Sequence, residues 1–317
     1  CDVCLVGSEM CIRDRAEGPI NWSDGLNHLI CFGFGFSARA LAEQLAALGW
    51  RITGTSRSAE GTERIRALGF AAARFDGTTP CTDIRAALQS ASHLVISAPP
   101  GEDGDPVLRQ HQSDIVVAPG LKWIGYLSTI GVYGDHGGAW VDETTPETPV
   151  SQRSKRRLAA EQSWLSLANS DGGPTVRVFR LAGIYGPGRS AIDQVRAGQA
   201  RRIVKPGQVF NRIHVDDIAA TLAAAIVTGG THSVYNVTDN EPAPPQDVIG
   251  YAAQLLGVPA PPEVPIEDVG LSPMTKSFYS ELKRVRNERI KQDLGVRLQY
   301  PTYREGLASV LAATRAN

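Results

Sequence analysis

The sequence predicts an α/β fold, a doubly wound parallel sheet with helices on both faces, followed by a smaller C-terminal lobe. Two observations predict it. From Asn27 onward, short apolar runs alternate with helical stretches and are joined by short loops, which is typical of right-handed crossovers in a parallel sheet. After Gly183, proline and glycine become frequent and the apolar runs shorten, which indicates a less regular lobe.

The size and charge of the chain restrict its class. It has 317 residues, 42% of them hydrophobic, which is enough for a core near the size at which chains divide into lobes. A formal net charge of −1 argues against nucleic acid as a partner. No apolar stretch approaches the roughly 20 residues that cross a bilayer. We therefore expect a soluble, cytoplasmic protein with no membrane partner, and the cysteine spacing predicts no metal site.

The first residues do not continue the sheet pattern. The opening CDVCLVGSEMCIRDRAEG lacks the apolar segment and cleavage site of a signal peptide, and it resembles translated sequencing-adapter sequence. We expect residues 1–25 to be non-native or disordered. The dinucleotide-type sheet domain is expected over 26–183, with 213–238 returning to it, and the lobe over 184–212 and 239–317.

The individual elements follow from periodicity. The expected strands are Asn27–Phe32, Arg51–Thr55, Ala71–Phe75, His93–Ser97, Trp123–Ser128 and Thr175–Phe179. The expected helices between them are Ala38–Leu48, Thr62–Leu68 and Ile84–Ser90. One more helix and strand, Ile213–Val227 and Ser233–Val237, are expected to return to the sheet.

A glycine-rich loop joins the first strand to the first helix. Its sequence, Gly33-Phe34-Gly35-Phe36-Ser37-Ala38, fits the pattern G-x-G-x-x-G/A. The first glycine permits a tight turn, the second lets the backbone approach a pyrophosphate, and the small last residue lets helix and strand pack closely. The helix N-terminus then offers free N–H groups to the phosphates. This is the dinucleotide-binding loop of a Rossmann fold.

The end of the second strand predicts which dinucleotide binds. NAD-specific folds place an acid there for the ribose 2′-hydroxyl, but here Ser56 and Arg57 occupy the position. A guanidinium pairs well with a 2′-phosphate, so we expect NADP rather than NAD. The alternative for Arg57 is a solvated surface arginine. Asp76, at the end of the third strand, either caps a turn or contacts the adenine, and Ser97 and Ala98 are expected at the cofactor as well.

Later segments carry further motifs. They are Tyr126–Gly134 (YLSTIGVYG), the acidic pair Asp142 and Glu143, Arg180–Gly188 (RLAGIYGPG) and Ile213–Asp217 (IHVDD). On these residues the chain, from about residue 27 to its C-terminus, resembles the short-chain dehydrogenase/reductase superfamily. The resemblance is to the extended branch, which contains the NAD(P)-dependent epimerases and dehydratases.

The catalytic residues that the resemblance implies are only partly present. The family places a Ser or Thr at the end of the fifth strand, where Thr129 lies, and a Tyr and a Lys four residues apart on the next helix. With Glu161 aligned to the family's K-x-x-x-E, Arg153 falls at the tyrosine position and Arg157 at the lysine position. No tyrosine occurs between 146 and 171. Because a guanidinium is no base near neutral pH, the family's usual mechanism is not expected.

Other side chains are candidates for the missing proton relay. We expect Thr129 to orient a substrate oxygen, Tyr133 or His136 to pass the proton, and Arg157 to hold the nicotinamide ribose. Tyr185 is a further phenol near the expected site. Each has a structural alternative, since loop histidines are usually solvated and both tyrosines lie in segments that also pack.

The basic residues suggest what the substrate carries. The run Arg153–Arg157 is normally a solvated helix face, but two of its members occupy active-site positions, which favours an anionic small molecule. Arg201, Arg202 and Lys205 of the lobe can close over the same anion. Phe210 stands where the family has the arginine that clamps a nucleotide-sugar diphosphate, so that substrate class has no matching residue.

Two functions of different classes fit these residues. The first is an NADP-dependent oxidoreductase or epimerase acting on a polar small molecule between the two lobes, favoured by Thr129 and a complete substrate lobe. The second is a catalytically impaired, NADP-binding sensor or scaffold, favoured by the missing tyrosine. The resemblance also implies a homodimer.

Overall fold

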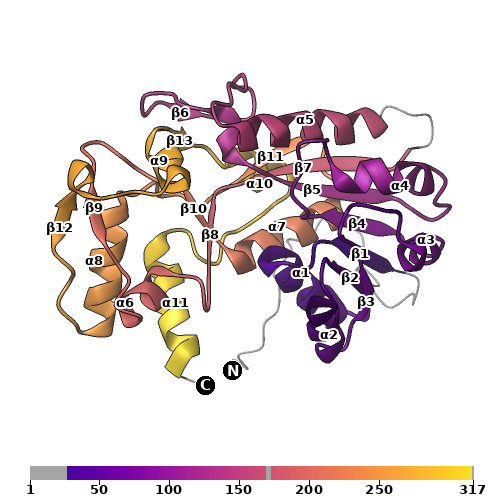
Figure 1. Cartoon of the computed structure of the whole chain (residues 1–317), viewed down its shortest axis with the longest axis horizontal. Coiled ribbons are helices and arrows are strands. Elements are labelled where there is room, and N and C mark those ends of the chain that lie inside the picture. Colours follow the sequence, from indigo (N-terminus) through magenta and orange to yellow (C-terminus); the bar gives the residue numbers. More distant parts are fainter. Residues whose placement is uncertain (1–26, 169–172, 316–317) are drawn as a thin grey trace, which may run out of the picture.

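The computed structural model of the protein describes residues 27–168 and 173–315 (Figure 1). The segment 1–25, predicted to be non-native, lies outside the described residues. A sheet with helices on both faces forms one half of the molecule, and a smaller lobe of short strands and helices forms the other.

The central sheet has seven strands in the order β11-β7-β5-β4-β1-β2-β3, and all its pairings are parallel. Its strands are β1 (His28–Phe32), β2 (Arg51–Ser56), β3 (Ala71–Arg74), β4 (His93–Ile96), β5 (Trp123–Thr129), β7 (Thr175–Leu181) and β11 (Val234–Val237). The strand order reverses direction between β1 and β4, so the carboxyl ends of these two strands border a crevice. The doubly wound α/β prediction is confirmed.

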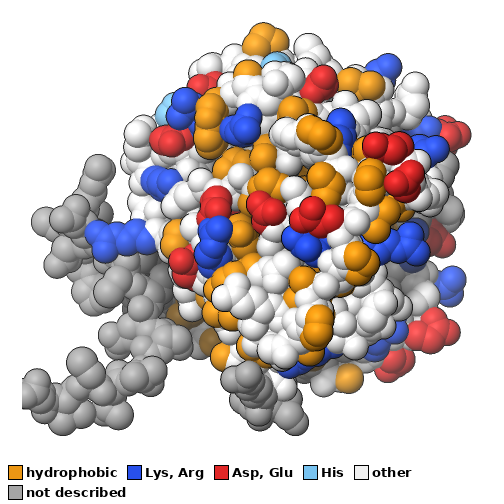
Figure 2. All heavy atoms as spheres, turned by 90° about the vertical axis from the view of Figure 1, so that its left-hand side faces the viewer, with side chains coloured by type: hydrophobic (Ala, Val, Ile, Leu, Met, Phe, Trp, Pro, Cys, Tyr) orange, Lys and Arg blue, Asp and Glu red, His pale blue; other side chains and the backbone are white. Residues whose placement is uncertain are grey.

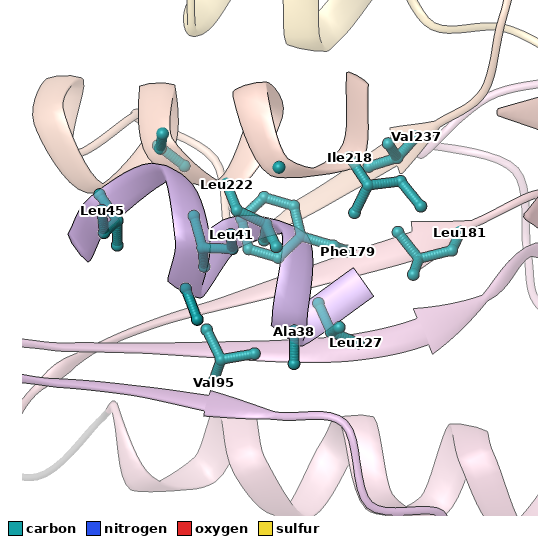
Figure 3. Close-up of a cluster of buried hydrophobic side chains, with 14 of the residues drawn as sticks. Ala38, Leu41, Leu45, Val95, Leu127, Phe179, Leu181, Ile218, Leu222 and Val237 are labelled. Atoms are coloured by element: carbon teal, nitrogen blue, oxygen red, sulfur yellow. The ribbon is translucent and has the colours of Figure 1, made fainter. Parts of the chain in front are cut away.

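Helices cover both faces of the sheet. On one face lie α1 (Phe36–Ala46) and α7 (Val215–Thr228), whose apolar side chains pack on β1, β5 and β7 (Figure 3). On the other lie α3 (Thr82–Leu88), α4 (Pro106–Val116) and α5 (Gln152–Leu167). The remaining helix of this half, α2 (Ala59–Ala67), follows β2 and contacts β2 and β3.

One helix of the sheet domain was missed from the sequence. α4 begins after Asp105, whose carboxylate accepts hydrogen bonds from the N–H groups of Val107 and Leu108 at 2.9 and 3.1 Å. Its buried positions include His111 and Ile115. A spacing of three to four residues between apolar positions indicates a helix, but the polar His111 within the apolar stripe made this periodicity less clear.

The lobe has a core of its own, to which Tyr185, Ile192, Val248 and Leu307 contribute. Its helices are α6 (Ala191–Arg196), α8 (Pro245–Leu256), α9 (Pro273–Tyr279) and α11 (Tyr303–Arg315), whereas α10 (Glu288–Asp293) packs on β11 of the central sheet. Two short parallel pairs complete it: β8 (Gly183–Tyr185) with β10 (Arg212–His214), and β9 (Arg202–Val204) with β12 (Glu263–Pro265). A third pair, β6 (Trp140–Val141) with β13 (Arg284–Val285), packs against the turn after β5.

The face seen when the lobe is turned to the viewer carries acidic and basic side chains interspersed among apolar ones (Figure 2). Within residues 27–168 and 173–315, no helix combines the length and the apolar character that crossing a membrane requires.

Candidate functional site

The glycine-rich loop has the backbone that its sequence predicts. Gly33 follows β1 with φ +84°, a conformation that favours glycine, and its N–H donates to Thr55 Oγ1 at 2.8 Å. The Phe34 N–H donates to the Thr55 carbonyl at 2.9 Å, which ties the turn to β2. A side chain on Gly33 would place its Cβ 2.9 Å from the Ala98 nitrogen. The first glycine is therefore required by both conformation and space.

The space around Gly35 is open, whereas the space around Gly33 is filled by neighbouring atoms. It lies at the N-cap of α1, it is exposed, and a Cβ built on it meets no atom within 4 Å. No side chain caps the helix, so the N–H groups of its first turn have no internal acceptor. N–H groups without an internal acceptor and a partial positive charge at a helix start suit a phosphate.

The other loop residues hold the turn in place. The Phe34 ring packs against Phe70 with centroids 5.6 Å apart, and Ser37 and Ala38 are buried against the sheet. Phe36 lies under the Arg189 guanidinium, 6.0 Å from ring centroid to Cζ, so the start of α1 contacts the loop that leads into the lobe.

The end of β4 lies beside this loop. The N–H groups of Ser97 and Ala98 donate to the Phe32 carbonyl at 2.8 and 2.9 Å, and Gly33 packs against Ala98. Both residues are half-buried. They form one side of the crevice between β1 and β4, which is where ligands bind in open parallel sheets.

The end of β2 carries a free cation. Arg57 is exposed, and among the described residues no carboxylate lies within ion-pair distance of it. Ser56 Oγ lies 3.5 Å from the Ser58 nitrogen. Arg74, which the sequence analysis missed, ends β3 opposite Ser56, and its Nε donates to the Arg57 carbonyl at 3.3 Å. Arg74 could have been predicted from the sequence, because it is an arginine at the end of the strand next to β2.

Two nearby groups have structural partners. Asp76 accepts from the N–H and hydroxyl of Thr78 at 2.9 and 2.7 Å, and these hydrogen bonds lower the pKa of the exposed Asp76 carboxyl. Of its two predicted roles, turn capping is the one observed. Arg39, on α1, pairs with Glu43 at 2.7 Å, one helical turn away.

β5 ends at Thr129, and the residue before it contacts a buried ion pair. Thr129 is half-buried, its Oγ1 accepts from the Gly131 N–H at 3.1 Å, and no hydrogen bond to a described residue uses its own hydroxyl proton. The adjacent Ser128 donates to Glu161 of α5, which in turn binds Arg180 of β7 at 2.8 Å. Burial opposes the charge of Arg180, but the hydrogen bonds and charge of Glu161 raise its pKa above the ordinary value.

Arg153 and Arg157 project from one face of α5, one turn apart, toward different surroundings. Arg157 Nη1 donates to the Leu127 carbonyl at 3.0 Å and to the Tyr126 hydroxyl at 3.2 Å, so it lies against β5. Arg153 is exposed, and its guanidinium lies 5.5 Å from the ring centroid of Phe278 on α9. The helix therefore places one arginine at the sheet and the other at the lobe.

The predicted proton relays have partners of their own within the fold. Tyr133 is fully buried in the short 3₁₀ turn Ile130–Tyr133, and its hydroxyl donates to Asn236 Oδ1 at 2.8 Å. Burial raises its pKa to about 12. The His136 Nε2 lies 3.0 Å from the Tyr133 carbonyl, within its own loop. Tyr185 is buried beneath Gly306 of α11, and burial raises its pKa. Their contacts are those of packing residues.

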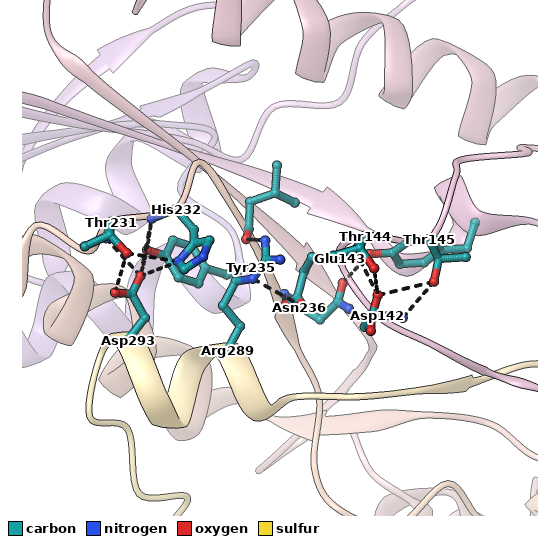
Figure 4. Close-up of polar contacts among 12 residues, drawn as sticks. Asp142, Glu143, Thr144, Thr145, Thr231, His232, Tyr235, Asn236, Arg289 and Asp293 are labelled. Carbon is teal, nitrogen blue, oxygen red and sulfur yellow. Dashed lines mark hydrogen bonds and ion pairs between the residues drawn. The ribbon is translucent and has the colours of Figure 1, made fainter.

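The acidic pair after β6 also has structural partners (Figure 4). Asp142 accepts from the Thr144 N–H at 2.9 Å and closes a turn. Glu143 accepts from the Asn236 N–H at 2.8 Å, and Arg289 Nε lies 3.7 Å from it. Glu143 thus fixes the segment after β6 to β11 and α10.

Two cations of the lobe that were expected over the substrate are engaged inside the lobe. Arg202 pairs with Glu263 at 2.6 Å, and Lys205 donates to the Tyr279 carbonyl. Phe210 packs edge-on against Tyr279, with centroids 5.2 Å apart.

Two named proteins are similar to this sequence. The chain is 32% identical over 281 residues to Protein YeeZ of Escherichia coli (strain K12), an alignment that covers 85% of this chain and 94% of YeeZ. It is 30% identical over 141 residues to the 3-diazoavenalumate denitrifying reductase of a Streptomyces species, covering 41% of this chain and 45% of that protein. No family model matches the sequence.

Solved structures agree with the fold. A functionally unknown conserved protein from Silicibacter pomeroyi DSS shares 51% identity and superposes with a TM-score of 0.82, covering 91% of this chain and 99% of that one. A Methylobacillus flagellatus protein named for the NAD-dependent epimerases/dehydratases shares 29% identity, with a TM-score of 0.68 and coverage of 92% and 99%. MoeE5, solved with UDP-glucose and NAD, shares the fold at 21% identity, with a TM-score of 0.71 and coverage of 92% and 99%. The chain belongs to the family of Protein YeeZ and has the nicotinamide-dinucleotide-binding fold of the NAD-dependent epimerases and dehydratases.

Proposed function

We propose that this protein is an NADP(H)-dependent oxidoreductase that acts on a small molecule bound between the sheet domain and the lobe. The observation that carries the proposal is the free guanidinium of Arg57 after β2, beside the open loop at Gly35. The partial relative from Streptomyces, which is named a reductase, supports hydride transfer as the type of reaction.

The preference for NADP rests on charge. The 2′-phosphate of NADP carries negative charge that NAD lacks, and Arg57 offers planar paired donors that no carboxylate of a described residue engages. Arg74, held against the Arg57 carbonyl, adds a second positive charge at the same strand ends. An aspartate or glutamate, the usual ribose partner in NAD-specific folds, is missing at this position.

Calorimetric titration with NADP⁺ and NAD⁺ tests this preference. NADP⁺ is expected to bind more tightly, and Arg57→Ala is expected to remove about 1.5–3 kcal/mol of that preference while NAD⁺ affinity stays unchanged. Arg66→Ala is the matched control, because Arg66 already pairs with Glu63 at 2.5 Å on α2. Equal affinities of the unmutated protein for the two cofactors would contradict the assignment.

The reacting end of the cofactor is expected at Thr129. The cofactor supplies a hydride when bound, and the chain must orient the acceptor and hold the cofactor. The Thr129 hydroxyl has a free proton for a substrate oxygen or nitrogen, and Gly131 fixes its direction. Arg157, anchored to the Leu127 carbonyl, has further N–H groups for the nicotinamide ribose.

Substitution of Thr129 separates chemistry from binding. In a screen of carbonyl and diazo compounds with NADPH, Thr129→Val is expected to lower turnover by a factor of roughly 10²–10⁴ with NADPH affinity retained. Thr129→Ser keeps the hydroxyl and is expected to retain most of the activity. Arg157→Ala is expected to weaken NADPH binding first. Full turnover by Thr129→Val would exclude the proposed role.

A second function, an NADP-binding sensor or scaffold, is favoured by one observation. Tyr133 is buried with its hydroxyl on Asn236, and α5 contains no tyrosine, so the end of β5 has no phenol with a lowered pKa. Under this function the protein binds NADP(H) with the predicted preference but turns over no compound in the screen.

A further inference from the structure

We infer that Arg153 and Phe278 form the substrate subsite, and that its ligand is a monoanionic aromatic carboxylate. The inference rests on the proposed function, because it names the substrate class of the same site. It starts from a contact between two elements far apart in the sequence, the N-terminal turn of α5 in the sheet domain and α9 in the lobe.

The contact leaves the donors of Arg153 free. Its guanidinium lies over the Phe278 ring, 5.5 Å from the centroid, so the ring contacts the face of the cation. The N–H groups lie in the plane of the guanidinium, and no hydrogen bond or ion pair to a described residue engages them. A guanidinium stacked on one face and open along its edge is arranged for bidentate binding of a carboxylate.

The neighbourhood favours one negative charge. Lys205 is bonded to the Tyr279 carbonyl, and Arg212 to the carbonyls of Phe210 and Ala243. These cations are therefore engaged with the main chain, whereas Arg153 is not. A diphosphate needs several cations around it, but a carboxylate needs one.

The lobe side of the contact is aromatic. Phe278 is 48% exposed, which is costly for a phenylalanine unless something covers it. Behind it, Tyr279 packs against Phe210 with ring planes at 77°. An aromatic ring attached to the carboxylate can cover the exposed part of Phe278, which a small carboxylate such as acetate cannot.

The site also lies near the reacting end of the fold. Arg153 precedes Ser154, whose Oγ lies 2.8 Å from the position of a Cβ built on Gly131, and the Thr129 Oγ1 lies 3.4 Å from the same point. The N-terminal turn of α5 therefore adjoins the turn after β5. Arg153 is therefore carried by the helical turn that packs next to Thr129.

Calorimetry with simple probes tests the subsite. Protein saturated with NADP⁺ is titrated with trans-cinnamate, with its neutral amide and with acetate. Cinnamate is expected to bind at least tenfold more tightly than the other two probes. Arg153→Gln should lower cinnamate affinity at least tenfold, Arg153→Lys should lower it less, and Phe278→Leu should lower it several-fold.

Two controls make the outcome decisive. Arg156→Gln, on the same turn but paired with Glu102 at 2.6 Å, should bind cinnamate like the unmutated protein. NADP⁺ affinity is measured for every variant and should not change with Arg153→Gln. If the unmutated protein does not bind NADP⁺, the cofactor assignment has failed independently of the subsite. The cinnamate titration is then repeated with NAD⁺. Equal binding of cinnamate and cinnamamide, or unchanged cinnamate binding by Arg153→Gln, would overturn the subsite.

Discussion

Arg57 and Arg180 lie at the carboxyl ends of two strands of one sheet, but in opposite surroundings. Arg180 is 2% exposed, binds Glu161 at 2.8 Å and lies over the Tyr133 ring, 4.9 Å from its centroid. Arg57, just after β2, is exposed and has no carboxylate partner among the described residues. The same side chain is a structural group at β7 and a candidate ligand-binding group at β2.

The difference shows how function can be separated from architecture in this fold. A buried charge must be paired inside the protein, since an unpaired one costs several kcal/mol. An exposed charge remains hydrated, so it has no such cost and can stay unpaired until a ligand binds. By this criterion Arg57 and Arg153 are candidates for ligand binding, whereas Arg180 and Arg202 are paired with carboxylates inside the protein.

Replacing both arginines by the same residue is the sharpest test of this comparison. Arg180→Met leaves Glu161 buried without its partner and is expected to lower the free energy of unfolding by about 3–5 kcal/mol. Arg57→Met is expected to change it by less than about 0.5 kcal/mol. Urea denaturation measures both. Adding Glu161→Leu to Arg180→Met should recover part of the loss, and a loss below about 1 kcal/mol for Arg180→Met would break the comparison.

Gly33 and Gly35 differ in the same way in their backbone, because one has a structural role and the other is open to a ligand. Gly33→Ala meets both an unfavourable φ and the Ala98 nitrogen, so it should cost about 1–3 kcal/mol of stability as well as cofactor binding. Gly35→Ala, with φ −89° and open space, should leave the melting temperature unchanged but lower NADP⁺ affinity at least tenfold. Unchanged NADP⁺ affinity in Gly35→Ala would mean that no pyrophosphate lies there.

Acid titration gives the smallest expected effect. Burial acts to raise the pKa of Asp293, but hydrogen bonds from Tyr235, His232 and Thr231 outweigh it and hold that pKa well below its ordinary value (Figure 4). A depressed carboxyl pKa stabilises the fold above the unfolded-state pKa of about 3.9. The stabilisation is lost as the pH falls below that value.

The substitution Asp293→Asn tests this direction of the pH dependence of stability. The variant is expected to be about 1 kcal/mol less stable than the unmutated protein near pH 7, with the difference shrinking as the pH falls below about 4. Denaturation at several pH values measures it. A difference that grows on acidification would show that Asp293 is protonated in the fold at neutral pH.

Local pattern was sufficient for much of the fold and for the geometry of the glycine-rich loop. The strands have the expected order along the chain, because buried parallel strands are apolar runs that need no distant information to be recognised. The loop at Gly33 has the expected turn. Element ends differed by a few residues: α1 begins at Phe36 rather than Ala38, since its N-cap is a glycine without a capping side chain.

The candidate proton relays could not be predicted in the same way. Tyr133 follows the catalytic-type threonine in the sequence, but the 3₁₀ turn after β5 rotates its ring into the core against Arg180. The side-chain direction depends on that turn, whose form is set by Thr129 and by packing against β7 and β11. A list of candidate proton relays from sequence therefore included groups that the fold buries.

The sequence by itself determined the Rossmann-type sheet, the phosphate-type loop at Gly33 and Gly35, and the arginine after β2, because each depends on neighbours within a few residues. Only the tertiary structure decided which charges are paired and which are free. Glu161 meets Arg180, and Arg153 meets Phe278, across segments that are distant in the chain. Such pairs form only when helices and strands from separate parts of the sequence pack together, so no local pattern encodes them.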